Sequence, residues 1–404
     1  MKHLTAIIVI FCGAAIAWVI LGNTLLFRTA DSDDSQRQAL SSQWGSAQSQ
    51  SAPVVTARVP VDVFNTRTQR VEHLFENVTV PIRSSRVNVN LDLEQRRKGL
   101  LWYNLYNVRF SSHYRIRNDT GNSSLSVHFR FPASNGSYAN VVYLIGGRPV
   151  DLASALTQGS VNFTLAPGQQ TTIDVAYFSH GIGSWQYTFG KDVQSVNDFA
   201  LTMTTNFNAI DFPTQTLLPV REEQLSHGWR LQWQYSTLVT GNGIGMTCPY
   251  PLQPGPLAQR ITFWAPVALL FYFFVMLLIT TLRGVELHPV NYFFLACAFF
   301  AFHLLFAYLV DRIALEAAFV ICSLVSMFLT ITYLRLVVGW RFAAVESGIA
   351  QLIYLVLFSY ALFNEGWSGL AITCGAIITL FVAMQLTGGI RWKERFAGNT
   401  MAEA

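Results

Sequence analysis

Residues 261–282 read ITFWAPVALLFYFFVMLLITTL, and no charged side chain interrupts the run between Arg260 and Arg283. A helix of this length rises about 33 Å at 1.5 Å per residue, which is enough to cross the hydrocarbon core of a bilayer. The composition of the whole chain agrees with this, because 51% of its 404 residues are hydrophobic and only 12% are charged. A soluble domain carries about twice that share of charge. The sequence therefore predicts an integral membrane protein.

More apolar runs extend this prediction on both sides of the first. They cover residues 4–27, 290–310, 313–334, 345–363 and 368–386. We therefore expect a membrane α-helical bundle of six spans, one N-terminal and five within residues 261–390. For residues 1–28 we favour an uncleaved transmembrane anchor over a cleaved signal peptide, because the apolar run is longer than the hydrophobic part of a typical signal.

The basic residues at the ends of the spans predict the orientation, because Lys and Arg are retained on the cytoplasmic side of a membrane. With a cytoplasmic N-terminus, the cytoplasmic side receives Lys2, Arg283, Arg335, Arg341, Arg391, Lys393 and Arg395. The short outer loops then hold Arg312 alone, although Arg28 and Arg260 flank the outer domain. Both termini are thus predicted to be cytoplasmic, with a tail at residues 391–404, and residues 29–260 are predicted to lie outside.

The outer residues divide by composition. Residues 29–53 are rich in Ser and Gln, which predicts a stalk that buries little, with Trp44 as its one packing anchor. Residues 248–260 begin with a proline-rich stretch, which predicts an irregular, stiff lead into the span at residue 261.

Residues 54–247 show the alternation of β-strands. Val87, Val89, Leu91 and Leu93 occupy every second position, and Gly- and Asn-rich turns separate this run from others like it. Many strands without intervening helical patterns predict a large all-β, sandwich-like domain inserted between spans one and two.

An aromatic strand within this domain allows two interpretations. In residues 229–235, Trp229 and Trp233 lie on the same face as Leu231 and Tyr235. Such a face packs in a sandwich core in most proteins, and we favour that interpretation. The alternative is a flat platform that binds a glycan.

The sequence contains no motif of a known catalytic mechanism, so we expect a protein that is not an enzyme and needs no cofactor. Of its five cysteines only Cys248 lies outside the apolar runs, so neither a disulfide framework nor a cysteine-based metal site is expected. The net charge of +4 is too small to suggest a nucleic-acid partner.

Two polar side chains lie well inside predicted spans, His303 in the third and Gln351 in the fifth. Buried polar groups in a bilayer are costly and often line a cavity or a ligand site. They could contact a ligand or lipid headgroup here. We favour the simpler interpretation that they form hydrogen bonds between helices.

Several phrases resemble the CreD-like family of bacterial inner-membrane proteins. They are Ser42–Gln48 (SQWGSAQ), Arg96–Tyr106 (RRKGLLWYNLY), Leu287–Leu295 (LHPVNYFFL), Tyr333–Arg335 (YLR) and Thr387–Trp392 (TGGIRW). The resemblance runs over most of the chain. It implies a multi-pass protein of the bacterial inner membrane whose residues 29–260 are periplasmic.

The resemblance also implies a role in cell-envelope integrity or stress tolerance, and it supplies no catalytic residues. We therefore expect contact with the lipid bilayer and an envelope protein or glycan bound by the periplasmic domain. The alternative is a permease or lipid-handling protein that uses the C-terminal helices.

Overall fold

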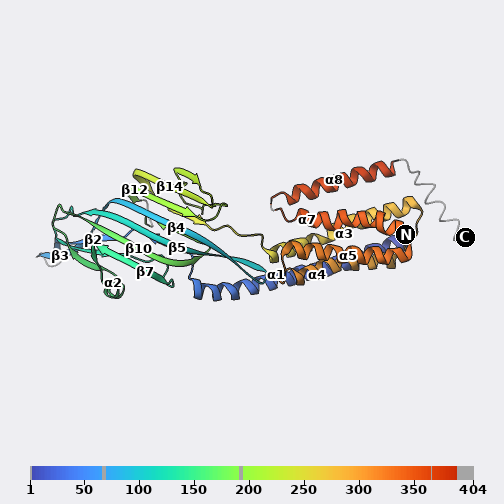
Figure 1. The fold of residues 1–404 in the computed structure, drawn as a ribbon, viewed down its shortest axis with the longest axis horizontal. Coiled ribbons are helices and arrows are strands. Elements are labelled where there is room, and N and C mark those ends of the chain that lie inside the picture. The colour runs from blue at the N-terminus through green and yellow to red at the C-terminus, as the bar shows by residue number, and fades with distance from the viewer. Residues whose placement is uncertain (1, 66–69, 191–193, 365, 389–404) are drawn as a thin grey trace. The chain divides into compact units, whose positions relative to one another are not determined.

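The computed structural model describes residues 2–65, 70–190, 194–364 and 366–388. The chain forms two compact units. The first, called here the helical unit, comprises Met1–Asp34, Gly99–Leu101 and Leu252–Ala404, and the second, the strand unit, comprises Ser35–Lys98 and Trp102–Pro251. Figure 1 shows coiled ribbons in the first and arrows in the second.

Among the residues that the structure describes, six helices are long and apolar enough to cross a membrane, which confirms the predicted spans. They are α1 (Lys2–Trp44), α3 (Pro254–Arg283), α4 (Pro289–Leu309), α5 (Leu315–Val337), the segments between Phe342 and Ala361, and α8 (Ser368–Thr387). The fifth span is built from η1 (Phe342–Ser347), α6 (Gly348–Gln351), η2 (Leu352–Leu357) and α7 (Phe358–Ala361), where η denotes a π-helix.

The core of the helical unit lies between α3, α4 and α5. Tyr272 and Phe299 pack with ring centroids 4.5 Å apart, and Phe302 stacks on Phe306 at 5.9 Å. All four side chains are fully buried. The most apolar 18 residues of α8 are only 11% buried, against 50% for α4, so α8 lies at the edge of the unit and presents most of its surface to lipid.

The strand unit contains three sheets. The largest has the order β13 (Arg221–Gln224), β14 (Trp229–Thr240), β12 (Gln194–Thr205), β4 (Ile82–Lys98), β5 (Leu101–Arg117), β10 (Gln170–Ile182), β7 (Tyr138–Ile145), β8 (Arg148–Pro149). The second has the order β3 (Arg70–Val80), β2 (Val54–Asn65), β6 (Ser124–His128), β9 (Val161–Thr164), and the third β1 (Gln48–Ser51), β11 (Ser184–Thr188), β15 (Ile244–Thr247). Strands β12 and β4 pair in parallel, as do β1 and β11, and the other pairs whose register the structure gives are antiparallel. A short helix, α2 (Leu152–Gln158), joins β8 to β9.

In the strand unit, every second residue along a strand is buried, as the alternation in the sequence predicts. Val87, Val89 and Leu91 of β4 are at most 2% exposed, while the residues between them are not buried. Apolar side chains from all three sheets form one continuous cluster. The predicted sandwich-like, mostly antiparallel architecture is confirmed.

The structure differs in part from the Ser/Gln-rich stalk predicted at residues 29–53. Trp44 packs as expected, with its ring 5.1 Å from that of His180, but the segment is more regular and more buried than predicted. Helix α1 continues to Trp44, because extending an existing helix avoids the cost of nucleating a new one. Strand β1 then buries Gln48 and Gln50, whose exposed fractions are 2% and 0%. The Nε2 of Gln50 donates to the Arg130 carbonyl at 3.0 Å, and the Tyr177 hydroxyl donates to its Oε1 at 2.7 Å. Amides can therefore be buried here because their hydrogen bonds are satisfied.

The irregular lead at residues 248–260 is also partly wrong. Helix α3 already begins at Pro254, with Gln253 as its N-cap. Proline fits the first turn of a helix because the amide it lacks would have no partner there.

Candidate functional site

The four side chains singled out in the sequence lie in different units and do not form one site. His303 and Gln351 are in the helical unit, and Trp229 and Trp233 are in the strand unit. Each is described in its own surroundings.

Strand β14 places its aromatic face toward the core. Trp233 is completely buried, and its indole N–H donates to the Leu217 carbonyl at 2.9 Å. Trp229 is half-buried, and its indole N–H donates to the Asn208 carbonyl at 2.9 Å. A ligand cannot stack on a ring that has no exposed surface, so Trp233 packs as a core residue in this fold.

Gln351 lies at the centre of a buried polar cluster that joins three helical elements. Its Nε2 donates to Ser326 Oγ on α5 at 2.9 Å, and Ser326 Oγ donates to the Ala298 carbonyl on α4 at 2.7 Å. The Oε1 of Gln351 and the Oγ1 of Thr330, one turn along α5, are buried without a hydrogen-bond partner among the described residues. Amide and hydroxyl bonds of this kind hold transmembrane helices together, and the two unused atoms leave capacity for a further polar group.

The helix that carries Gln351 is distorted on both sides of it. The π-helical segments η1 and η2 flank the four-residue α6, which ends at Gln351. At the end of η1, Ser347 shares a hydrogen bond of 2.8 Å with the Tyr272 hydroxyl of α3. π-Helical turns are rare and recur at functional sites because they redirect side chains. No pattern in the sequence indicates these turns.

His303 of α4 is fully buried where this helix packs against α1. Its Nδ1 donates to the Phe299 carbonyl of its own helix at 2.9 Å, and its ring lies 5.5 Å from the Trp18 ring in an edge-to-face arrangement. His303 Nε2 and Trp18 Nε1 are both buried without a hydrogen-bond partner among the described residues. His303 therefore packs α4 against the N-terminal helix and takes no part in the hydrogen bonds described for Gln351.

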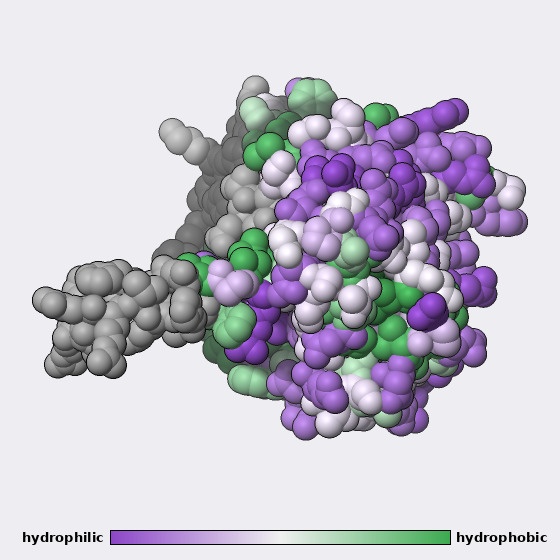
Figure 2. Space-filling view, turned by 90° about the vertical axis from the view of Figure 1, so that its left-hand side faces the viewer, coloured by the Kyte–Doolittle hydropathy of each residue, from purple (hydrophilic) through white to green (hydrophobic). Residues whose placement is uncertain are grey.

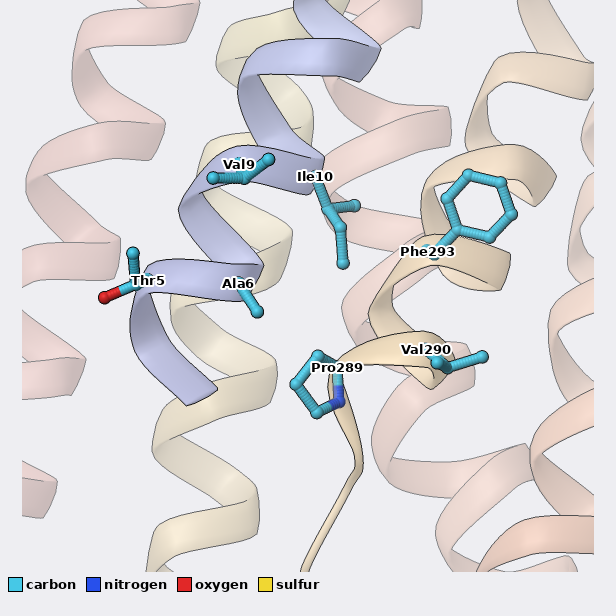
Figure 3. A pocket seen from close by; sticks show the side chains of 7 residues that line it. All are labelled: Thr5, Ala6, Val9, Ile10, Pro289, Val290 and Phe293. Carbon is cyan, nitrogen blue, oxygen red and sulfur yellow. The ribbon is translucent and has the colours of Figure 1, made fainter. Parts of the chain in front are cut away.

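Two grooves on the helical unit were not foreseen from the sequence. The larger, of about 770 Å³, lies between α1 and α4, and the smaller, of about 400 Å³, lies between α4 and α5. Figure 3 shows the larger one, called here the α1–α4 groove. Grooves arise from the packing of helices that are distant in sequence, so no local pattern indicates them.

The remaining chemistry of the described residues is sparse. No three His, Cys, Asp or Glu side chains among them come together as metal ligands would. Cys248 is fully buried, and desolvation raises the pKa of its thiol to about 12. The thiol therefore stays protonated near neutral pH and is a poor nucleophile.

Six candidate spans among the described residues, with a strand-rich segment between the first and second along the chain, define a multi-pass membrane protein. A family model described as inner membrane protein CreD matches residues 222–393, which contain the last strands and all five C-terminal spans. The inner membrane protein CreD of Escherichia coli (strain K12) is 24% identical over 212 residues, which are 48% of this chain. The expected resemblance to CreD-like proteins is thus confirmed over these residues.

These similarities cover only part of each protein. The aligned region spans 46% of the length of the Escherichia coli relative. A crystal structure of a candidate nutrient binding protein from Legionella pneumophila covers 54% of this chain and 75% of its own, at 9% identity and a TM-score of 0.30. A similarity that low supports no conclusion about function.

Proposed function

We propose that this chain is a non-enzymatic inner-membrane protein that contributes to cell-envelope integrity or stress tolerance. In this proposal the strand unit binds an envelope partner in the periplasm, and the helices anchor it in the bilayer. Similarity to the inner membrane protein CreD and the large strand unit between two spans support the proposal.

The observation that carries the proposal is the exposed edge strand β3. It lies at one end of the sheet β3-β2-β6-β9, so among the described strands it pairs only with β2. Residues 75–79 are all exposed, including Phe75 at 59% and Val78 at 39%. The Arg58 guanidinium lies 4.4 Å from the centroid of the Phe75 ring.

An edge strand with free backbone groups and apolar side chains suits the addition of a strand from another protein. Figure 2 looks onto the strand unit from the side where β3 and α2 are labelled in Figure 1, and shows hydrophobic residues grouped among hydrophilic ones. These features favour an envelope protein over a glycan as the partner, since Trp233 has no surface to offer a sugar.

A Val78→Lys substitution tests this edge. Lysine on an edge strand opposes the addition of a further strand, while an exposed substitution should change the free energy of unfolding by no more than about 0.5 kcal/mol. We expect the variant to be inserted and folded but unable to restore envelope integrity to a deletion strain, measured as survival in bile detergent.

The matched control is Val239→Lys, which changes another exposed valine, 67% accessible, in a different sheet of the same unit. It should restore survival like the unmodified chain. If Val78→Lys restored survival fully, the hypothesis that β3 binds the partner would be rejected.

The polar cluster at Gln351 favours a second candidate, a permease or lipid-handling protein that uses the C-terminal helices. The specific observation is the pair of unused buried oxygens, on Gln351 and Thr330, beside two π-helical segments. A polar solute or headgroup could satisfy these oxygens during passage.

For this candidate we expect that the double variant His303→Leu/Gln351→Leu inserts and folds but loses the envelope phenotype. The lost bond from Gln351 to Ser326 should cost only about 1 kcal/mol, and the hydrogen bond of His303 lies within its own helix, so the variant should still fold. Thr373→Val serves as control, because among the described residues the Thr373 hydroxyl donates only to the Gly369 carbonyl of its own helix. Unchanged survival of cells with a well-inserted double variant would exclude this candidate.

A further inference from the structure

The turn between β4 and β5 belongs to the helical unit, although the strands on either side of it belong to the strand unit. This segment, Gly99–Leu101, is called here the β4–β5 turn. Gly99 has φ at +58°, a left-handed conformation that glycine adopts without strain. Leu100 is only 4% exposed and packs in the apolar core of the helical unit. Turns between strands usually lie on the surface, so the burial of Leu100 means that this turn is docked on helices.

The backbone of the β4–β5 turn caps the first turn of α3. Pro254 and Pro256 have no amide hydrogen, so Gly255 carries the one amide of the first three helical positions. An amide at this position cannot bond within its own helix and needs a partner elsewhere. The Leu100 carbonyl, rather than the side chain of the N-cap residue Gln253, accepts the Gly255 N–H, at 2.9 Å. The second span therefore begins with a cap that comes from the β4–β5 turn.

At Gly255, three segments meet without room for a side chain. An added Cβ would lie 2.7 Å from Thr29 Oγ1 of α1 and 3.0 Å from the Leu100 Cβ. Glycine permits backbone and side chains to approach this closely because it has no Cβ. The β4–β5 turn thus contacts the start of α3 at the point where α3 also meets α1.

Two stretches that the sequence singles out separately come together here. Gly99 and Leu100 belong to the phrase at Arg96–Tyr106, and Gly255 belongs to the proline-rich lead at residues 248–260. Taken alone, the first is a hairpin turn and the second a stiff linker. Together they form one joint, in which the prolines leave a single amide and the distant turn supplies its acceptor.

We propose that the β4–β5 turn is a strap that controls the start of the second span. While the turn is docked, its carbonyl caps α3 and its leucine fills the core beside α1 and α3. Strands β4 and β5, of 17 residues each, lead directly into the turn, so a displacement of either strand reaches α3 through the chain. The cap is then lost and the first turn of α3 opens. The inference does not depend on a partner at β3, because the strap is part of the chain itself.

A Leu100→Ser substitution tests the strap without any change in α3. The full chain is reconstituted in lipid nanodiscs, and hydrogen exchange is followed by mass spectrometry. The first amides of α3, at Gly255, Leu257 and Ala258, should exchange about tenfold faster, the effect of a lost helix cap. Unchanged exchange at Tyr114 and Ile116 of β5 should show that the strand unit is still folded.

Leu218→Ser is the matched control, because Leu218 is 66% exposed in the strand unit. It should leave exchange at the start of α3 as in the unmodified chain. A folded Leu100→Ser protein with unchanged exchange in α3 would overturn the inference.

A second variant, Gly255→Val, should displace the turn from the side of α3 and accelerate exchange there as Leu100→Ser does. Its control is Gly369→Val, which changes the second residue of another span, α8, where an added Cβ meets nothing within 4 Å. This control should leave α3 unchanged. Equal exchange in the two variants would count against a docked turn at Gly255.

The double variant Leu100→Cys/Gly255→Cys separates release of the turn from a general loss of stability. A Cβ at position 255 lies 3.0 Å from that of Leu100, and a small shift reaches the separation of about 3.5–4.5 Å that a disulfide needs. The oxidised protein should show slow exchange at the start of α3, and reduction should accelerate it about tenfold. The inference is overturned if the cysteines do not cross-link in the folded chain, or if exchange is the same before and after reduction.

Discussion

A Trp233→Ala substitution is expected to destabilise the strand unit by about 3–5 kcal/mol, the usual cost of truncating a fully buried tryptophan. The ring has no exposed surface and packs within the cluster shared by the three sheets. Truncation also leaves the Leu217 carbonyl without its indole donor. Hydrogen exchange of β14 amides in the full chain should measure the loss, because local opening reports the stability of one region.

The matched variant is Trp229→Ala on the same strand. Trp229 is only half-buried, so its truncation should cost about 1–2 kcal/mol. Faster exchange in Trp233→Ala than in Trp229→Ala would agree with a core role for Trp233. A Trp233→Ala protein with unchanged exchange and lost glycan binding would instead support the platform interpretation and refute the packing described here.

The membrane spans could be predicted from the sequence because each depends on a local property, a long apolar run with at most one charged residue. The run at residues 345–363 lies almost wholly within the helical segments between Phe342 and Ala361. The strands of the second unit could be predicted for a similar reason, since alternation at Val87, Val89 and Leu91 records which face is buried. The apolar run of a span and the alternation of a strand can each be recognised within about 20 residues of sequence.

The parts that could not be predicted depend on partners distant in sequence. Gln48 and Gln50 look like linker residues until Arg130, Tyr177 and His180 supply their hydrogen bonds. The pairing of Gln351 with Ser326 likewise follows only from the packing of α6 against α5. The local sequence does not distinguish a polar side chain that is buried with its hydrogen bonds satisfied from one that is exposed to solvent.

A Gly228→Ala substitution should have the other large effect, a loss of at least about 3 kcal/mol in the strand unit. Gly228 precedes β14 with φ at +90°, and an added Cβ would lie 1.9 Å from the Thr205 carbonyl oxygen. Thr205 is the last residue of β12. The residue before it, Thr204, pairs with Arg230 of β14, so the two strands are joined next to Gly228. Relief of the clash would therefore require β14 to separate from β12 at this end.

The contact and the backbone strain can be separated with Gly168→Ala. Gly168 lies in a turn of the same unit with φ at +80°, but an added Cβ would meet nothing within 4 Å. In this control the free energy of unfolding should fall only by the cost of holding an alanine in the left-handed conformation, about 1–2 kcal/mol. Hydrogen exchange of β12 and β14 should accelerate strongly in Gly228→Ala and little in Gly168→Ala. Equal losses in the two variants would mean that strain alone acts at Gly228, and that β14 does not approach Thr205 as closely as the structure has it.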